Sequence, residues 1–97
     1  MIKSETFANW VDGLRDRVAV ARIEVRIARM ADGNPGDVKP LGNGISEMRV
    51  NYGPGYRVYF LQRGDTVVIL LCGGDKSTQN KDVTKAYELA EEWKQNG

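Results

Sequence analysis

The chain has 97 residues, which is enough for one compact domain with a modest core and too few for two. Hydrophobic residues make up 41% of the chain, and this content excludes a disordered protein. The formal net charge is only +1, from 14 Lys and Arg against 13 Asp and Glu, so nucleic-acid binding would need a local basic cluster.

Histidine is absent and cysteine occurs once, which removes several kinds of catalytic and metal site. Ser-His-Asp and Cys-His catalysis, His-ligated metals, internal disulfides and zinc knuckles are all excluded. Cys72 ends an apolar run over residues 67–72, where we expect a buried, unreactive thiol. That run is too short to span a membrane, and the first residues lack a signal-peptide pattern, so we expect a cytoplasmic protein without a membrane partner.

The first third of the chain predicts two helices. Apolar residues recur at three- and four-residue spacing from Phe7 to Leu14, as on one face of a short helix. Residues 18–30 fit a helical stripe, but residues 22–27 also alternate like a strand. The length of this segment and its three alanines favour a helix. Gly33 and Pro35 are suited to end it.

The middle of the chain predicts strands and the last part a helix. Strand patterns cover residues 48–52, 56–61 and 66–71, and the short loops between them predict an antiparallel meander. Ile2 is a candidate for a further edge strand. Apolar residues from Val83 to Trp93 predict a helix with one apolar face. The expected fold is a single α+β domain over residues 1–97, with three helices on one face of a small antiparallel sheet of three to four strands.

A basic surface is predicted on the other face of this sheet, which we expect to be open to water. Arg49 and Arg57 lie on neighbouring predicted strands, Lys76 follows the third strand, and Lys39 lies in the loop that leads into the sheet. Three tyrosines nearby could stack on bases, which together would suit single-stranded RNA. They are Tyr52, Tyr56 and Tyr59. The alternative is a solvated face with cross-strand Glu–Arg pairs, in which Glu47 takes part.

Other charged groups give weaker signals. Arg22, Arg26 and Arg29 form a stripe on the second predicted helix that could grip phosphates or a partner, or simply be its solvated face. Asp75 and Asp82 are too scattered to predict a metal site.

Three blocks of sequence resemble a known protein family. They are Gly33–Arg49, Gly53–Phe60 with its Gly-Pro-Gly-Tyr-Arg-Val-Tyr motif, and Leu71–Gln79 with its Gly-Gly-Asp-Lys-Ser-Thr-Gln motif. The chain is similar to the HigB-like "addiction module killer protein" group, phage-type members of the RelE/ParE toxin superfamily. Residues 7–10 and 22–29 also match the usual layout of this group, so the resemblance covers nearly the whole chain.

The resemblance implies a RelE/ParE-like fold and a toxin of a type II toxin–antitoxin system. The expected partners are a cognate helix-turn-helix antitoxin of the HigA kind, the ribosome and mRNA. Toxins of this type cut mRNA in the ribosomal A site and inhibit translation, without a metal or other cofactor. The 2′-hydroxyl attacks the adjacent phosphate, and cationic side chains stabilise the phosphorane that forms.

The resemblance also implies roles for individual residues. Arg57 resembles the phosphate-binding arginine of the family, whose guanidinium can hold two phosphate oxygens. Lys76 resembles the basic residue after the last strand and would stabilise the leaving group or the phosphate. Arg49 occupies a position that is often basic, Lys39 is a further candidate for the same work, and Asp82 lies where relatives carry Tyr or an acidic group.

Two questions stay open at this stage. The general base could be a Lys of lowered pKa, Tyr52, Tyr56 or Asp82, because the chain lacks the histidine that some relatives use. The alternative functions are a ParE-like inhibitor that binds DNA gyrase without breaking bonds, and a catalytically weak protein that mainly binds its antitoxin.

Overall fold

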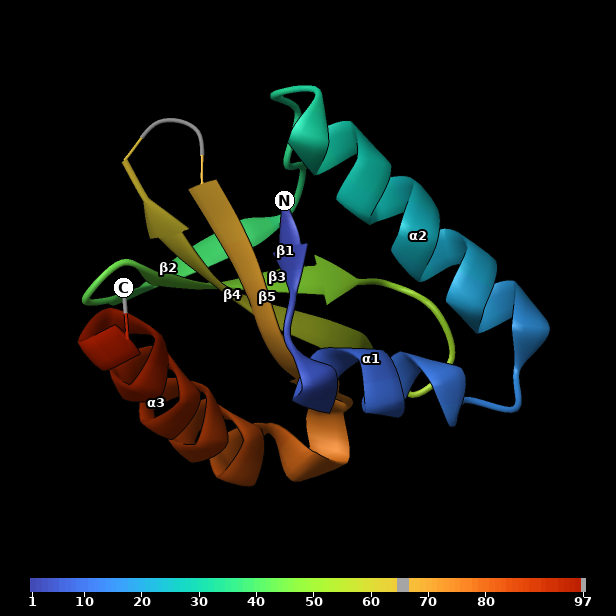
Figure 1. Ribbon diagram of the computed structural model, residues 1–97. Helices are drawn as coiled ribbons and strands as arrows, with labels where there is room; N and C mark the ends of the chain where they lie inside the picture. The colour runs from blue at the N-terminus through green and yellow to red at the C-terminus, as the bar shows by residue number, and fades with distance from the viewer. Residues whose placement is uncertain (65–66, 97) are drawn as a thin grey trace.

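The computed structural model describes residues 1–64 and 67–96, and it arranges them as one sheet with helices on both faces (Figure 1). Two helices, α1 (Glu5–Asp12) and α2 (Arg17–Ala31), pack on one face. The long helix α3 (Gln79–Asn96) packs on the other face and is preceded by a short 3-10 helix, η1 (Lys76–Thr78). The three predicted helices are confirmed, including the segment whose pattern also fitted a strand.

The sheet has five strands, one or two more than predicted. They are β1 (Ile2–Lys3), β2 (Val38–Gly42), β3 (Ile45–Val50), β4 (Tyr56–Arg63) and β5 (Val67–Gly74). Their spatial order is β1-β5-β4-β3-β2; β2 to β5 form an antiparallel meander and β1 pairs parallel with β5. The predicted strand at residues 66–71 begins at Thr66, which lies outside the described residues, as does Asp65 of the predicted turn before it.

The prediction that Lys39 lies in a loop is wrong, because Lys39 is on β2. Pro40 in the middle of that segment argued against a strand, but β2 is the edge of the sheet, where proline is tolerated. The loop between β2 and β3 is Asn43-Gly44, and both residues have positive φ (57° and 82°), as the tight mirror-image hairpin turn requires. Sequence periodicity also misplaced Tyr52, which lies beyond the end of β3.

The prediction that all helices pack on one face is wrong, because the strands are buried on both faces. Alternate residues of β3 and β4, such as Met48 and Val58, contact α1 and α2. The residues between them, such as Ile45 and Leu61, pack with α3. Near-continuous apolar strands are expected when both faces of a sheet are covered. The face with Arg49 and Arg57 is therefore only partly open to water.

A β-bulge in β5 changes which side chains face α3. Tyr59 pairs with Cys72, and the next residue, Phe60, pairs with Leu70, so Leu71 is the extra residue. Leu71 and Cys72 consequently both belong to the core under α3 instead of alternating. As a result, Gly73 faces α1 and Gly74 faces α3, the reverse of what regular alternation would give.

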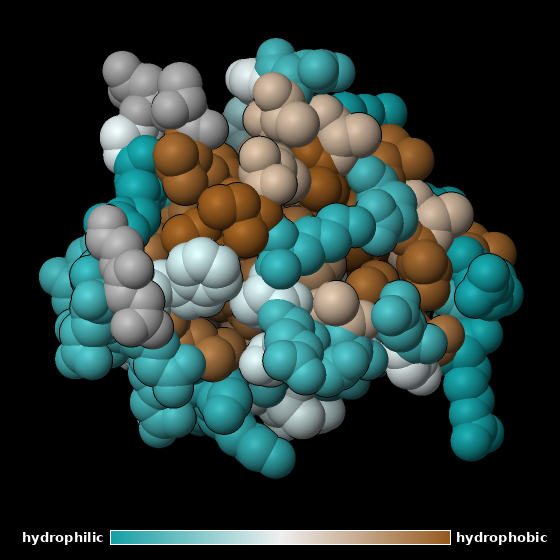
Figure 2. Space-filling view, viewed as in Figure 1, coloured by the Kyte–Doolittle hydropathy of each residue, from teal (hydrophilic) through white to brown (hydrophobic). Residues whose placement is uncertain are grey.

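Hydrophobic side chains are visible at the surface over β1 and β5, between α2 and α3 (Figure 2). Met1, Ile2 and Val67 are among the exposed large apolar residues. Within the described part of the chain, no helix is both long enough and apolar enough to cross a lipid bilayer.

Candidate active site

The register of the sheet places the predicted basic residues in two neighbouring rows on the α3 side. In one row, Arg49 on β3 lies opposite Arg57 on β4. In the next row, Lys39 on β2 lies opposite Glu47, and Glu47 lies opposite Tyr59. Residues that pair across antiparallel strands project to the same face, and like charges directly opposite each other are destabilising. The Arg49–Arg57 pair therefore needs a compensating negative charge.

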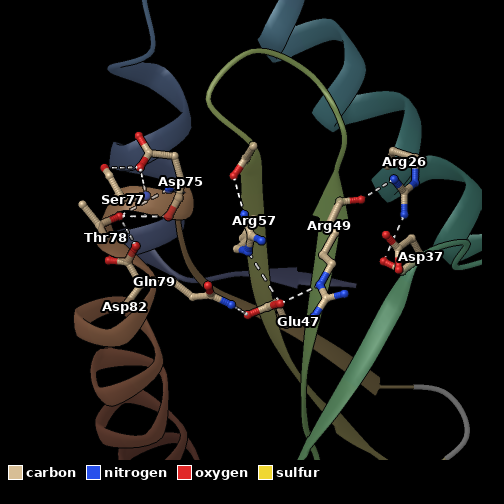
Figure 3. Close-up of polar contacts among 11 residues, drawn as sticks. Arg26, Asp37, Glu47, Arg49, Arg57, Asp75, Ser77, Thr78, Gln79 and Asp82 are labelled. Carbon is tan, nitrogen blue, oxygen red and sulfur yellow. Dashed lines mark hydrogen bonds and ion pairs between the residues drawn. The ribbon is translucent and has the colours of Figure 1, made fainter.

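Glu47 supplies that charge and is the centre of the site (Figure 3). Its side chain is 1% exposed. One carboxylate oxygen accepts a hydrogen bond from Arg49 Nε at 2.9 Å and lies 3.6 Å from Arg57 Nε. The other oxygen accepts from Gln79 Nε2, at the start of α3, at 2.9 Å. The carboxylate thus links β3, β4 and α3.

The pKa of Glu47 is below its ordinary value despite this burial. Burial alone would raise the pKa, but the hydrogen bonds from Arg49 and Gln79 and the charges of Arg57 and Arg49 outweigh it. Glu47 is therefore ionised at neutral pH. An ionised carboxylate that is already engaged by three partners is better suited to orient the two arginines than to accept a proton.

Arg57 is held from two sides. Its side chain is 13% exposed, Nη1 donates to the carbonyl of Gly55 at 2.7 Å, and Nε faces Glu47. Lys76 lies nearby, because a methyl group built on Gly55 would come within 3.2 Å of Arg57 Nη1 and 3.6 Å of Lys76 Cβ. The turn between β3 and β4 and the segment after β5 therefore bring Arg57 and the exposed Lys76 to the same place.

Asp75 and Asp82 border this cluster at the junction of β5 and α3. Asp75 caps η1 by accepting from the Ser77 backbone N–H at 2.8 Å, and its hydrogen bonds with Ser77 lower its pKa. The Thr78 hydroxyl donates to the Asp82 carboxylate. Gly74 lies opposite Arg57 in the sheet, and Asp82 packs directly on its Cα. A side chain at Gly74 would displace the carboxylate.

Tyr59 and Cys72 lie beneath the charged groups and are closed to solvent. The Tyr59 hydroxyl has no hydrogen-bond partner among the described residues. Burial, together with the charges of Glu47 and Asp82, raises the pKa of Tyr59 above its usual value. Burial raises the pKa of the Cys72 thiol to about 12, which agrees with the expected unreactive thiol.

The three tyrosines do not form one stacking surface, which corrects that part of the prediction. Tyr59 is fully buried. Tyr56 belongs to the core on the α1 side, with its ring 6.2 Å from that of Trp10. Tyr52 also lies on that side, where its hydroxyl donates to Asp16. Tyr52 and Tyr56 therefore lie on the side of the sheet opposite to the Arg57 side chain, which does not favour them as the base.

Sequence reasoning underrated Glu47 and Gln79. The Glu–Arg pairing was expected as part of a solvated sheet face, whereas Glu47 is buried. The sequence prediction gives Gln79 no role in the site. The available signal was a lone carboxylate in the middle of a strand that also carries Ile45, Met48 and Val50, since a buried charge requires partners. Elsewhere in residues 1–64 and 67–96, no group of three acidic or Cys side chains is placed to hold a metal ion.

The arrangement brings two guanidinium groups to one end of the sheet, with Lys76 beside Gly55 and the Asp82 carboxylate at the edge of the cluster. Guanidinium groups bind planar pairs of oxygens and are suited to phosphate. The site can therefore hold a phosphodiester and stabilise added negative charge on it.

Comparison with known proteins places the chain in a family. Residues 7–95 match the family described as "Phage derived protein Gp49-like (DUF891)". A relative from Haemophilus influenzae, described only as "Uncharacterized protein", is 49% identical over 87 residues, which are 90% of this chain and 88% of the relative. No solved structure matches the chain. The family match covers nearly the whole chain, so the protein belongs to the Gp49-like family of phage-derived proteins, a family associated with toxin–antitoxin systems.

Proposed function

We propose that this protein is a HigB-like toxin of a type II toxin–antitoxin system, with a RelE/ParE-like fold, that cleaves mRNA on the ribosome. The observation that carries the proposal is that the buried Glu47 engages both Arg49 and Arg57, with Lys76 close to Arg57 beside Gly55. Family membership supports the toxin–antitoxin context. The natural partner is then a helix-turn-helix antitoxin, and the site of action is the cytoplasm.

The proposed reaction is an internal transesterification. The 2′-hydroxyl oxygen attacks the adjacent phosphorus, and the bond from phosphorus to the 5′-oxygen breaks. The products are a 2′,3′-cyclic phosphate and a 5′-hydroxyl. The 2′-hydroxyl loses its proton to a base, and the 5′-oxygen gains one. The chemistry needs charge stabilisation and two proton transfers, which side chains can supply without a metal.

The position of each site residue indicates its role in the proposed cleavage reaction. Arg57 and Arg49 bind the phosphate oxygens and stabilise the phosphorane. Lys76 is exposed beside Arg57 and stabilises the leaving 5′-oxygen. Asp82 is the remaining named candidate for the base near Arg57, and Thr78 orients its carboxylate. Lys39 lies in the row next to Arg49 and contacts the RNA backbone.

Induced expression with transcript mapping tests the proposal. We expect growth arrest and cleavage within translated codons, detected by primer extension. Arg57→Ala and Lys76→Ala should each lower cleavage by about a hundredfold or more, because each removes a group that stabilises transition-state charge. Arg15→Ala removes an exposed charge from the loop between α1 and α2 and should act like the wild type.

Other outcomes point to the alternative functions. DNA damage and filamentation with intact transcripts would indicate a gyrase inhibitor. Tight antitoxin binding without growth arrest would indicate a catalytically weak protein. Full cleavage by both Arg57→Ala and Lys76→Ala would contradict the assigned site.

A further inference from the structure

The outer face of α2 carries an apolar stripe that the fold does not use. The helix packs on the sheet through Ala19, Ile23 and Ile27. A second series, Val18, Ala21, Val25 and Ala28, lies at alternating three- and four-residue spacing and is exposed. Val18 is 52% exposed and Val25 is 48% exposed. This spacing is that of the contact positions of a helix that packs against another helix.

The apolar stripe on α2 forms one side of a surface groove. Val18, Ala21 and Val25 line a groove of about 650 Å³ together with Val50, the last residue of β3, and Tyr52, which follows it. Figure 2 shows apolar and polar side chains interspersed over the region that α2 occupies in Figure 1. The stripe extends over eleven residues, a rise of about 15 Å, which matches about three turns of a partner helix.

The rim of this groove is positively charged. Arg17, Arg22 and Arg29 line it, and no acidic residue does. Arg26 also lines it, but its guanidinium donates to backbone carbonyls of Pro35 and Arg49 and is part of the fold. Glu24 on the same helix is paired with Lys3 at 3.6 Å. The groove thus offers apolar contact flanked by guanidinium groups.

We propose that this groove, lined by Val18, Ala21, Val25 and the three rim arginines, binds an acidic amphipathic helix of a protein partner. A second copy of the chain does not fit, because it would bring the same arginines against each other. Exposed valines supply apolar contact, which an amphipathic helix uses and a phosphate backbone does not. The guanidinium of Arg22 also covers the Tyr52 ring, 4.8 Å from its centroid, so that ring is not open for base stacking.

The groove and the Glu47 cluster lie on opposite sides of the sheet. Tyr52 belongs to the core on the α2 side, whereas the Glu47 cluster shares the α3 side. A helix bound in the groove therefore need not cover Arg57 or Lys76. The proposal stands on the shape and charge of α2 and does not depend on the proposed RNA cleavage.

A designed peptide tests the groove directly. The probe is a fluorescent helical peptide of about 21 residues, three heptads, with Leu at the two contact positions and Glu at the flanking positions. We expect saturable binding by fluorescence anisotropy at micromolar concentration, and a decrease in affinity as salt is raised. Val25→Asp and the double variant R22E/R29E should each weaken binding by about tenfold or more. Val67→Asp, at a valine on β5 that is 38% exposed, should leave binding unchanged.

Several results would overturn the proposal. They are an absence of saturable binding, equal binding by V25D and wild type, and a preference for a control peptide with Lys in place of Glu. Competition by a single-stranded RNA oligonucleotide that itself depends on Arg22 and Arg29 would assign the groove to nucleic acid. Concentration-dependent self-association lost in V25D would assign it to a second copy. Circular dichroism and thermal unfolding of each variant establish that the fold is intact, and R22E/R29E provides the test if V25D is unstable.

Discussion

At the scale of single residues, the function of the basic cluster depends on a carboxylate that a ligand would not touch. Arg49 and Arg57 are held side by side because Glu47 engages both from a buried position. Removing one partner of such a buried set leaves the others uncompensated, which costs more than the set contributes when intact. Glu47 is therefore a positioning residue whose effects should appear in stability as well as in activity.

The pH dependence of unfolding tests this role. The folded-state pKa of Glu47 is lower than its ordinary value of 4.5, so its contribution to stability is present above pH 4.5 and is lost as pH falls through the folded-state pKa. Glu47→Gln should lower the free energy of unfolding by about 2 kcal/mol at pH 7, because hydrogen bonds to a charged group contribute most.

Urea unfolding of both proteins between pH 3 and pH 7 provides the measurement, and we expect the difference to shrink below about pH 4.5. Glu88→Gln, an exposed carboxylate on α3, serves as the control and should show no such trend. A constant difference across the whole range would contradict an ionised, stabilising Glu47.

At the scale of elements, the junction of β5 and α3 is fixed by close approach to two glycines. Gly73 lies against the Trp10 ring on the α1 side, and Gly74 lies against Asp82 and Thr78 on the other side. A Cβ atom at either position would overlap these neighbours. The packing of both helix layers therefore depends on two positions that carry no side chain.

Gly74→Ala should displace Asp82 and destabilise the fold by about 1–3 kcal/mol, the usual cost of overpacking. Chemical denaturation measures the stability, and transcript cleavage measures the effect on the site. Gly13→Ala is the matched control, because Gly13 has a negative φ and a methyl group there would meet only the carbonyl oxygens of Asn9, at 3.3 Å, and Trp10, at 3.6 Å. A Gly74→Ala protein with wild-type stability and cleavage would show that Asp82 can move freely.

Much of this element structure could be predicted from the sequence. The helix at residues 17–31 and the meander follow from periodicity and turn residues, which are local properties. The edge strand around Pro40 and the burial of Glu47 depend on neighbours distant in the chain. The same holds for the candidate site: the strand pattern predicts that Arg49 and Arg57 are close, but not the contact of Gln79 with Glu47, which depends on the packing of α3 over the sheet. The separation of the tyrosines depends on the packing of α1 and α2 on the other face.

At the scale of the whole molecule, one sheet separates two cores that share their strands. Ile23 of α2 lies in one core and Leu89 of α3 in the other, while β4 contributes alternate residues to both. Neither core can persist when β4 leaves the sheet. A domain of this size with shared strands is expected to unfold in one cooperative step.

Each core contains a tryptophan that can report on it. Trp10 packs against the core with α1 and α2, and Trp93 packs against the core with α3. Trp93→Phe and Trp10→Phe each leave a single reporter, and we expect the fluorescence transitions in urea to coincide with the loss of helical circular dichroism. Separate midpoints for the two reporters within one variant background would indicate that the α3 layer detaches first.

The extra residue in β5, Leu71, reverses which face of the sheet each of the following residues points to. With strict alternation, Gly73 would lie beside the arginines and Gly74 would lie under Trp10, so each helix layer would meet the wrong partner. Insertions or deletions of one residue between positions 67 and 72 should therefore be far more damaging than substitutions there. By contrast, paired changes that restore the two-against-one count should be tolerated, which makes segment length, more than side-chain identity, the constraint on how this strand can diverge.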